Sequence, residues 1–244
     1  MEVLTPIEPQ SPDFELAWPL PPQQPELADR EIHVWSARLL RPDFDYPAGL
    51  RLLSESEQER AAMFHFDRDR KNFIARRAML RSILGHYLKV EPAQISLASE
   101  ERGKPRLAGA DGPSPLHFNF SHSRNLALFA VSRFSPLGVD VEKIRPMPEM
   151  REIAAGFCSK EENALLHAAA PEQKLEVFFS LWTRKEAFLK ATGEGIAGKL
   201  AQLDCSVAPP PWSFHALSPA PGFVGALAAA AGGPEPQCWQ WLPQ

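Results

Sequence analysis

Cysteine is scarce in this chain, which has only Cys158, Cys205 and Cys238 among its 244 residues. An odd number of widely separated cysteines does not build the disulfide framework of a small secreted protein. No CxxC pair or Cys/His cluster has the spacing of a zinc site. We therefore expect three free thiols in a reducing compartment.

Long apolar runs and targeting signals are also missing. Residues 1–6 lack the basic start and apolar core of a secretory signal. No apolar run approaches the roughly 18 residues that cross a bilayer. The net charge of −4 at pH 7 gives no electrostatic reason to bind nucleic acid. We expect a cytoplasmic protein with neither a nucleic-acid nor a membrane partner.

Two common catalytic signatures do not occur. The frame of a P-loop, G-x-x-x-x-G-K-[ST], is absent, so the turn that contains Lys104 is not a P-loop. There is no Gly-x-Ser-x-Gly elbow, so Ser121 beside His122 does not predict a serine hydrolase.

The order of predicted elements suggests a repeat. Residues 1–28 are rich in Pro, Gln, Glu and Asp and predict an extended or poorly ordered extension. The remainder predicts an α+β fold of two similar α/β halves, residues 29–135 and 136–244, each running strand, helices, strands. Shared composition alone would also produce such a likeness. A true repeat predicts pseudo-twofold symmetry, with a ligand cleft at the seam between the halves.

A helix is predicted over residues 178–190, where apolar residues recur at helical spacing. Trp182, Glu186 and Lys190 are four residues apart, so they project from consecutive turns along one stripe. Gly193 follows as a helix stop. Taken alone, Glu186 and Lys190 are most simply a surface ion pair, because such pairs are common.

A strand is predicted over residues 138–143, where apolar and charged residues alternate. Asp140 and Glu142 are two residues apart, so both carboxylates lie on the same face. Like charges placed together are costly unless a cation lies between them. Mg²⁺ commonly takes one or two carboxylates together with water and substrate phosphates. This strand is therefore a candidate magnesium site.

Basic residues gather on the outer face of a predicted helix over residues 69–88, with Arg68 just before it. A solvated helix face accounts for most of them. The turn that contains Lys104 also has a simple interpretation as an exposed turn. Ser121 and His122 lie at the tip of a predicted hairpin, where His122 is an exposed turn residue or a phosphate ligand. A protonated histidine would gain a charge-assisted hydrogen bond to phosphate.

Four of these segments occur together in a family pattern. In this order, the chain resembles the 4′-phosphopantetheinyl transferases, and more closely their surfactin-type (Sfp-like) branch. The segments are Gly103-Lys104-Pro105, Phe118-Asn119-Phe120-Ser121-His122-Ser123, Gly138-Val139-Asp140-Val141-Glu142 and Trp182-Thr183-Arg184-Lys185-Glu186-Ala187-Phe188-Leu189-Lys190. Any one alone would be weak, but the ordered set covers roughly residues 60–195.

The resemblance implies a fold, a reaction and roles for residues. It implies a monomer of two similar halves with the active site at the seam. The reaction moves the 4′-phosphopantetheine group from coenzyme A to a serine of an apo acyl or peptidyl carrier protein, in fatty-acid or secondary-metabolite synthesis, with Mg²⁺ as cofactor and 3′,5′-adenosine bisphosphate released. The implied metal ligands are Asp140, Glu142 and Glu186; the catalytic residues are Glu186, Lys185 and Asp140; the coenzyme A contacts are Arg68, Lys104, Ser121, His122, Lys185 and Lys190.

Two other functions remain open from the residues. A Mg²⁺-dependent phosphodiesterase would also use three carboxylates, but the acidic net charge does not favour it. A non-catalytic coenzyme A-binding protein would not require a metal site. Incubation with coenzyme A and an apo-carrier protein separates the three, because only the transferase adds mass to the carrier.

Overall fold

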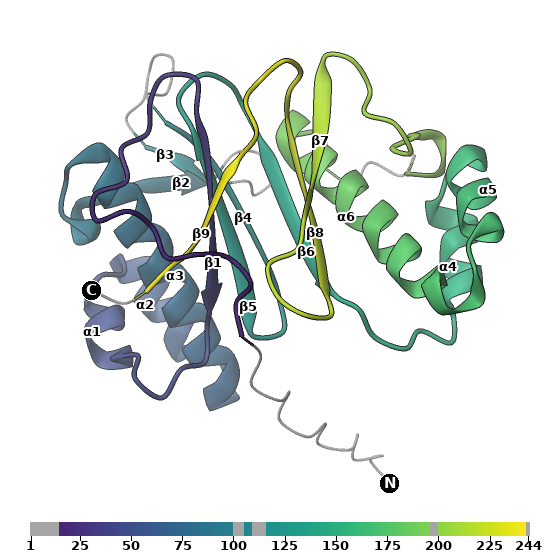
Figure 1. Cartoon of the computed structure of the whole chain (residues 1–244). Helices are drawn as coiled ribbons and strands as arrows, with labels where there is room; N and C mark the ends of the chain where they lie inside the picture. Colours follow the sequence, from purple (N-terminus) through teal and green to yellow (C-terminus); the bar gives the residue numbers. More distant parts are fainter. Residues whose placement is uncertain (1–14, 100–104, 109–115, 196–199, 243–244) are drawn as a thin grey trace, which may run out of the picture.

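The protein is built from two sets of elements that follow the same order along the chain (Figure 1). The structure is a computed structural model that describes residues 15–99, 105–108, 116–195 and 200–242. The first set comprises β1 (Ile32–Arg38), α1 (Tyr46–Arg51), α2 (Glu55–Ala62), α3 (Asp67–Leu88), β2 (Leu97–Ser99), β3 (Pro105–Leu107), β4 (His117–Ser123) and β5 (Leu126–Ser132). The second comprises β6 (Gly138–Lys143), α4 (Met150–Phe157), α5 (Lys160–Ala168), α6 (Lys174–Thr192), β7 (Trp212–Leu217), β8 (Phe223–Ala230) and β9 (Gln237–Gln240).

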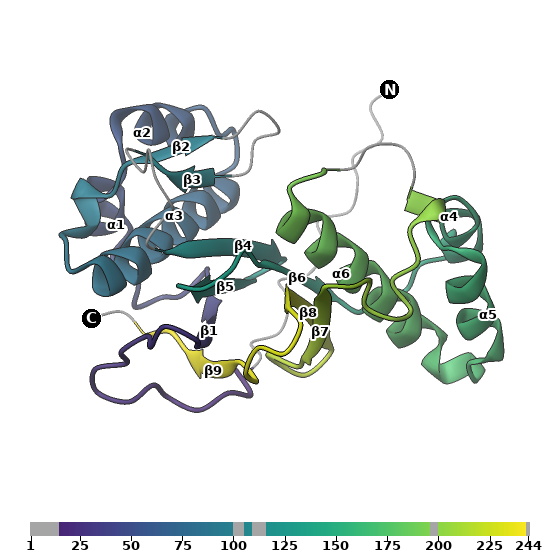
Figure 2. The ribbon, with the colours of Figure 1, turned by 90° about the horizontal axis from the view of Figure 1, so that it is seen from above.

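Two sheets occupy the middle of the molecule and the helices flank them on both sides (Figures 1 and 2). One has the order β4-β5-β1-β9 and the other has the order β6-β8-β7, while β2 and β3 form a separate two-stranded sheet among the first-set helices. In each of the two larger sheets a central strand, β5 or β8, pairs antiparallel with both neighbours that belong to its own set. The predicted α+β fold is confirmed.

Apolar side chains fill three spaces between these layers. The space between the two sheets is filled from both, for example by Val34 of β1 and Val139 of β6. A second cluster lies between the four-stranded sheet and α3, and it includes Trp35, Phe129 and Met79. Ala187 of α6 packs in a third cluster with Ala226 of β8. Each sheet is therefore covered on both faces, which explains why β5 is buried along its whole length.

The repeat extends to individual hydrogen bonds. Ser54 and Glu57 form a capping box at the start of α2, and Ser159 and Glu162 form one at the start of α5. In the first set, the carboxylate of Glu57 also accepts a hydrogen bond from buried Arg81 of α3, at 2.9 Å. In the second set, Glu162 accepts one from a buried basic residue of α6, at 2.7 Å. These equivalent positions lie 105 residues apart along the chain, from 54 to 159 and from 57 to 162.

The two ends of the described chain pack against each other and against both sets of elements. Strand β9 pairs parallel with β1, so residues near the C-terminus add an edge to the four-stranded sheet. Residues 15–31 contain no helix or strand and follow the surface. They are fixed by bonds such as Gln240 N–H to Pro19 O (2.9 Å) and Ala17 N–H to Pro219 O (2.8 Å). The division of the chain at residues 135 and 136 stays a prediction, and β9 crosses it.

The cysteines and the helices agree with the sequence as far as the structure describes them. Cys158, Cys205 and Cys238 are all free thiols. Burial raises the pKa of each thiol, to about 12 for Cys205. Among the described residues, no helix combines the length and the apolar character needed to cross a membrane.

Candidate functional site

The candidate site begins with a close approach between strand β6 and helix α6. Gly138 opens β6, and a Cβ atom built on it would lie 2.0 Å from Ala187 O and 2.5 Å from Ala191 N. Only glycine permits this contact. The approach places the carboxylate-bearing face of β6 directly against the turn of α6 that carries Glu186 and Lys190.

Asp140 is the centre of the cluster that results. Its Oδ1 accepts hydrogen bonds from Lys190 Nζ at 2.7 Å and from the Ser121 hydroxyl at 2.6 Å. Lys190 Nζ also donates to Val139 O at 3.2 Å. The other oxygen, Oδ2, is buried and has no hydrogen-bond partner among the described residues. A buried carboxylate oxygen without a partner is costly, so this atom favours a cation.

Strands β4 and β6 meet at this point through side chains rather than through a backbone ladder. The Ser123 hydroxyl donates to Glu142 Oε2 at 2.7 Å and accepts from Lys143 N–H at 3.1 Å. Asn119 Oδ1 accepts from Val139 N–H at 2.9 Å. Alternate residues of β4 therefore hold alternate positions of β6, and the seam between the two sets of elements is also where the carboxylates lie.

Electrostatic repulsion links the three carboxylates. Burial raises the pKa of Glu186, and the nearby charges of Asp140 and Glu142 raise it further, while Lys190 opposes them. Burial likewise raises the pKa of Glu142, with Asp140 adding to the effect and the Ser123 hydroxyl opposing it. The charge of Asp140 therefore makes Glu142 and Glu186 harder to ionise, and added positive charge would relieve the cluster.

The predicted metal set is not preassembled in this structure. Among the described residues, no three Asp, Glu, His or Cys side chains are arranged so that they could hold a metal ion. Instead, the ammonium of Lys190 lies on Asp140 and supplies the positive charge. The chemistry of the donors still suits magnesium, because all are carboxylate oxygens and Asp140 Oδ2 is unpaired.

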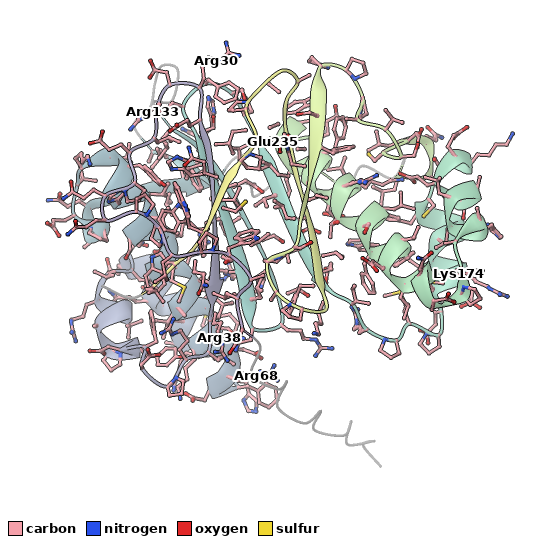
Figure 3. The ribbon with its side chains drawn as sticks, in the orientation of Figure 1. Arg30, Arg38, Arg68, Arg133, Lys174 and Glu235 are labelled. Carbon is pink, nitrogen blue, oxygen red and sulfur yellow. The ribbon has the colours of Figure 1, made fainter. Side chains whose placement is uncertain are left out.

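A basic cavity of about 360 Å³ lies beside this cluster, between α3 and the β4–β5 turn. His122 connects the two, since the charges of Arg76 and Lys190 both act on it. Arg68 projects from the first turn of α3 at the lower edge of the molecule (Figure 3). The cavity is lined by Phe64, Arg68, Asp69, Asn72, Phe73, Arg76, His122 and Arg124. Its three arginines make it suitable for a phosphate group.

His122 differs in charge from the expectation. Loss of water around the imidazole, followed by the charges of Arg76 and Lys190, lowers the pKa of His122 to about 4. Arg76 Nη1 lies 2.6 Å from Nε2 and 2.9 Å from Nδ1 of the ring. Because a guanidinium only donates, the imidazole accepts and is neutral. Without an anion, the protonated form expected for phosphate binding is therefore not the stable one.

Lys185 lies away from the other expected site residues. The family resemblance makes it a catalytic residue and a coenzyme A contact, which stays a prediction, but its side chain is fully buried on another face of α6. Its ammonium donates to Glu162 Oε2 (2.7 Å), Phe157 O (2.8 Å) and Leu200 O (2.8 Å). All three ammonium hydrogens are thus used within the protein. Lys185 joins α6 to α4 and α5, and it has no free donor for a phosphate.

Two other expected coenzyme contacts also need comment. The Ser121 hydroxyl donates its hydrogen to Asp140, so it cannot also donate to a phosphate, and it orients the carboxylate instead. Lys104 lies outside the described residues. Arg68 and His122, which are far apart in the sequence, do line the same cavity.

The sequence alone does not distinguish four residues at the site, which are Arg76, Asn72, Ser123 and Arg124. Arg76 was one of several arginines on a helix face, and nothing in the helical period distinguishes the one that meets His122. Ser123 was part of the Ser-His-Ser segment, and its spacing of two from Ser121 was an available signal. Strand β4 extends to Ser123, so the predicted loop shrinks to a tight turn in which Arg124 has φ of 55°.

Comparison with known proteins covers both sets of elements. Residues 42–133 match a family model described as 4′-phosphopantetheinyl transferase, N-terminal, and residues 136–224 match one described as 4′-phosphopantetheinyl transferase superfamily. The 4′-phosphopantetheinyl transferase HetI of a Nostoc species is 41% identical over 232 residues, which is 91% of this chain and 97% of that protein.

More distant relatives agree in name. The 4′-phosphopantetheinyl transferase Sfp of Bacillus subtilis is 30% identical over 148 residues, 61% of this chain and 63% of that protein. The human L-aminoadipate-semialdehyde dehydrogenase-phosphopantetheinyl transferase is 30% identical over 168 residues, 66% of this chain and 54% of that protein. The carboxylate–lysine cluster lies at the seam of two repeated sets of elements, beside the basic cavity. Because both sets match family models and a relative is matched along nearly its whole length, this chain belongs to the 4′-phosphopantetheinyl transferase family.

Proposed function

We propose that this protein transfers the 4′-phosphopantetheine group from coenzyme A to a serine hydroxyl of an apo acyl or peptidyl carrier protein. The observation that carries the proposal is the contact between two unlike regions at one seam. The basic cavity suits the phosphorylated nucleotide end of coenzyme A, and the cluster around Asp140 suits the diphosphate. His122 lies between the two regions, under the influence of charges from both.

The basic cavity would bind the nucleotide end of coenzyme A. Arg68, Arg76 and Arg124 supply positive charge, and a phosphate beside His122 would raise the pKa of that imidazole and make it a donor. The rings of Phe64 and Phe73 also line the cavity and offer apolar surface to a base. These contacts are remote from the bond that breaks.

Asp140, Glu142 and Glu186 would hold magnesium together with the diphosphate. When bound, the ion would neutralise phosphate charge and favour cleavage of the phosphoanhydride. The cluster suits a magnesium ion, because its carboxylates repel one another and Asp140 Oδ2 has no hydrogen-bond partner among the described residues. Lys190 holds Oδ1, and its positive charge would stabilise a phosphate placed beside the cluster.

The residues of this chain then handle the proton. Glu186 accepts the proton of the carrier serine hydroxyl, directly or through a water. The serine oxygen then forms its bond to the phosphorus that carries pantetheine. The bond from that phosphorus to the bridging oxygen breaks, and its electron pair leaves with 3′,5′-adenosine bisphosphate.

The test is transfer measured by mass spectrometry. Purified protein is incubated with coenzyme A, MgCl₂ and a panel of apo-carrier proteins, and gain of a phosphopantetheine mass on a carrier is the expected result. Asp140→Ala should abolish transfer while the protein stays folded. Glu186→Gln should also lose transfer, because it removes the base. Its matched control is Glu176→Gln, on the exposed first turn of α6, which should leave transfer intact. Hydrolysis of coenzyme A without carrier modification would instead indicate a phosphodiesterase.

Removal of Mg²⁺ tests the metal separately from the fold. Chelation should stop transfer, and Mg²⁺ should restore it. Full transfer by folded Asp140→Ala, or by protein in excess chelator, would contradict the metal assignment. Cytoplasmic location and a monomeric state are part of this proposal, and gel filtration with light scattering checks the second.

A further inference from the structure

A larger cavity, of about 860 Å³, lies on the other side of α3 from the basic cavity. We call it the first-set cavity. Trp35 of β1 and Ser82 and His86 of α3 line it, together with Trp241 beyond β9. Segment 21–25 of the N-terminal extension also contributes to its wall. None of its lining residues belongs to the site described above.

The repeat identifies what this cavity corresponds to in the second set. Arg81 of α3 and Lys185 of α6 are equivalent, because each donates to the capping-box glutamate and to two backbone carbonyls. In α6, Glu186 and Lys190 follow Lys185 by one and five residues. In α3, Ser82 and His86 follow Arg81 by the same one and five residues, and both line the first-set cavity.

Strand register gives the same correspondence independently. The last residue of β1, Arg38, pairs with the first residue of the central strand β5, Leu126. In the same way the last residue of β6, Lys143, pairs with the first residue of the central strand β8, Phe223. Counted back from these ends, Trp35 corresponds to Asp140, and the shift differs by one residue from the 104 between Arg81 and Lys185. Trp35 and Asp140 are 105 residues apart, which is the shift between the two capping boxes. Both face the long helix of their own set. The first-set cavity is therefore the counterpart of the carboxylate site.

The carboxylate site and the first-set cavity differ in the strand that lies along their edge. In the second set, β4 lies along the edge of β6 and supplies Ser121 and Ser123. In the first set, β9 takes the corresponding edge of β1, and Trp241 N–H bonds to Ser36 O at 2.8 Å. His86 Nε2 bonds to Pro25 O at 2.8 Å and ties α3 to the extension. The two ends of the chain thus roof the cavity.

The chemistry of the counterpart is reversed. Where the second set has Asp140, Glu142 and Glu186, the first has Trp35, Ala37 and Ser82, so no carboxylate remains at these positions. The charged lining residues, which are Asp45, Lys89 and Glu91, are exposed at the rim. Asp45 is already used, because its Oδ1 caps α1 through Ala48 N–H at 2.8 Å.

Aromatic side chains form the floor. Trp35, Phe44 and Tyr87 are each less than a tenth exposed and line the cavity. The Trp35 indole N–H donates to Tyr87 Oη at 3.0 Å, so the polar ends of these rings satisfy one another. Much of each ring packs against other aromatic side chains, for example Trp35 against Trp239 and Phe44 against Tyr46. The remaining surface of the floor is apolar and aromatic, which favours an aromatic partner.

We propose that the first-set cavity is a second ligand site, which binds an uncharged aromatic small molecule and neither coenzyme A nor a metal ion. Its volume falls within the roughly 300–1,000 Å³ of small-molecule sites. Its neutral aromatic floor gives a charged phosphate no counter-charge. The proposal does not depend on the transferase reaction, since it concerns residues that the reaction does not use.

The experiment uses the full-length protein and Nile red, an uncharged aromatic fluorophore. We expect saturable binding to one site, seen as a rise in emission, and no displacement by excess coenzyme A with Mg²⁺. Ser82→Phe should fill the cavity from α3 and weaken probe binding at least tenfold. Ser56→Phe, the same change on the exposed face of α2, should leave the probe affinity unchanged.

Ala48→Phe fills the cavity from α1 and serves as a second test where Ser82→Phe does not fold. Thermal unfolding checks each variant, and phosphopantetheine transfer should persist in all three. Displacement by coenzyme A, or unchanged affinity in folded Ser82→Phe and Ala48→Phe, would overturn the proposal. Binding that is seen only after removal of residues 1–14 would also overturn it, because that segment would then be the occupant.

Discussion

Replacing Gly138 with alanine is the sharpest test of how the site is held together. The added Cβ would lie 2.0 Å from Ala187 O, 2.5 Å from Ala191 N and 3.0 Å from the carbonyl carbon of Lys190. Ordinary contact begins near 3.4 Å. Because all three atoms belong to the backbone of α6, no side-chain rotation relieves the clash. Strand and helix must therefore separate by on the order of 1 Å, the difference between these distances.

The expected magnitude follows from two opposed effects. Overpacking typically costs about 1–3 kcal/mol, and backbone contacts place this case toward the upper end. Lower entropy of the unfolded chain returns up to about 1 kcal/mol. A net loss of about 2 kcal/mol lowers Tm by roughly 4–8 °C in a chain of this size. Separation also carries Lys190 away from Asp140, and a 1 Å misplacement can cost ~100-fold in rate.

Gly156→Ala is the matched control. Gly156 lies near the end of α4, and a Cβ built on it has no atom within 4 Å. This change should leave transfer intact and raise stability by up to about 1 kcal/mol, because alanine favours a helix. Calorimetric unfolding and mass-spectrometric transfer measure both variants. If Gly138→Ala matched Gly156→Ala in Tm and in rate, the close approach would not be what positions the carboxylates.

Three further outcomes follow from the site. Glu186→Gln should raise Tm at pH 7.5 while transfer is lost. The pKa of the Glu186 carboxyl is higher in the folded protein than in the unfolded chain, so ionised Glu186 destabilises the fold increasingly as pH rises from the unfolded-state pKa through the folded-state pKa. A difference in Tm between variant and parent that persists at pH 4 would contradict this origin. His122→Ala should raise KM for coenzyme A more than it lowers kcat, whereas His167→Ala on α5 should change neither; a fall in kcat alone would place His122 in the chemistry. Lys185→Ala should cost about 3–5 kcal/mol, because it strands a buried carboxylate, whereas Lys160→Ala at the exposed start of α5 should stay within about 0.5 kcal/mol by urea unfolding; equal stabilities would refute the structural role.

Periodicity predicted the parts of the site that lie within single elements. Asp140 shares a strand face with Glu142, and Glu186 lies one turn from Lys190, because these spacings follow from local backbone geometry. Local geometry also gave Lys185 a place about 100° around the helix, but could not say what it would meet there. Packing of α4 and α5 against α6 decides that, and it buries the ammonium on Glu162.

Contacts between elements distant in sequence were out of reach for the same reason. Which arginine of α3 meets His122 depends on how the helix is rotated over the β4–β5 turn, and several arginines share its outer face. The Ser121 hydroxyl has rotational freedom that no pattern fixes, and proximity to Asp140 directs it away from the cavity. The order of motifs nevertheless identified the family, because it depends on the sequence and not on these details.

The last strand has a consequence for synthesis. Because β9 joins the edge of β1, the first sheet to begin forming is also the last to be completed, when residues 237–240 leave the ribosome. Until then β1 presents an open edge that can pair with another chain. A fragment that ends near residue 135 would lack β9 and would keep that edge open. A label fused close to β9 would therefore act on the sheet that contains β4, whose His122 lines the basic cavity, although the two are far apart in the sequence.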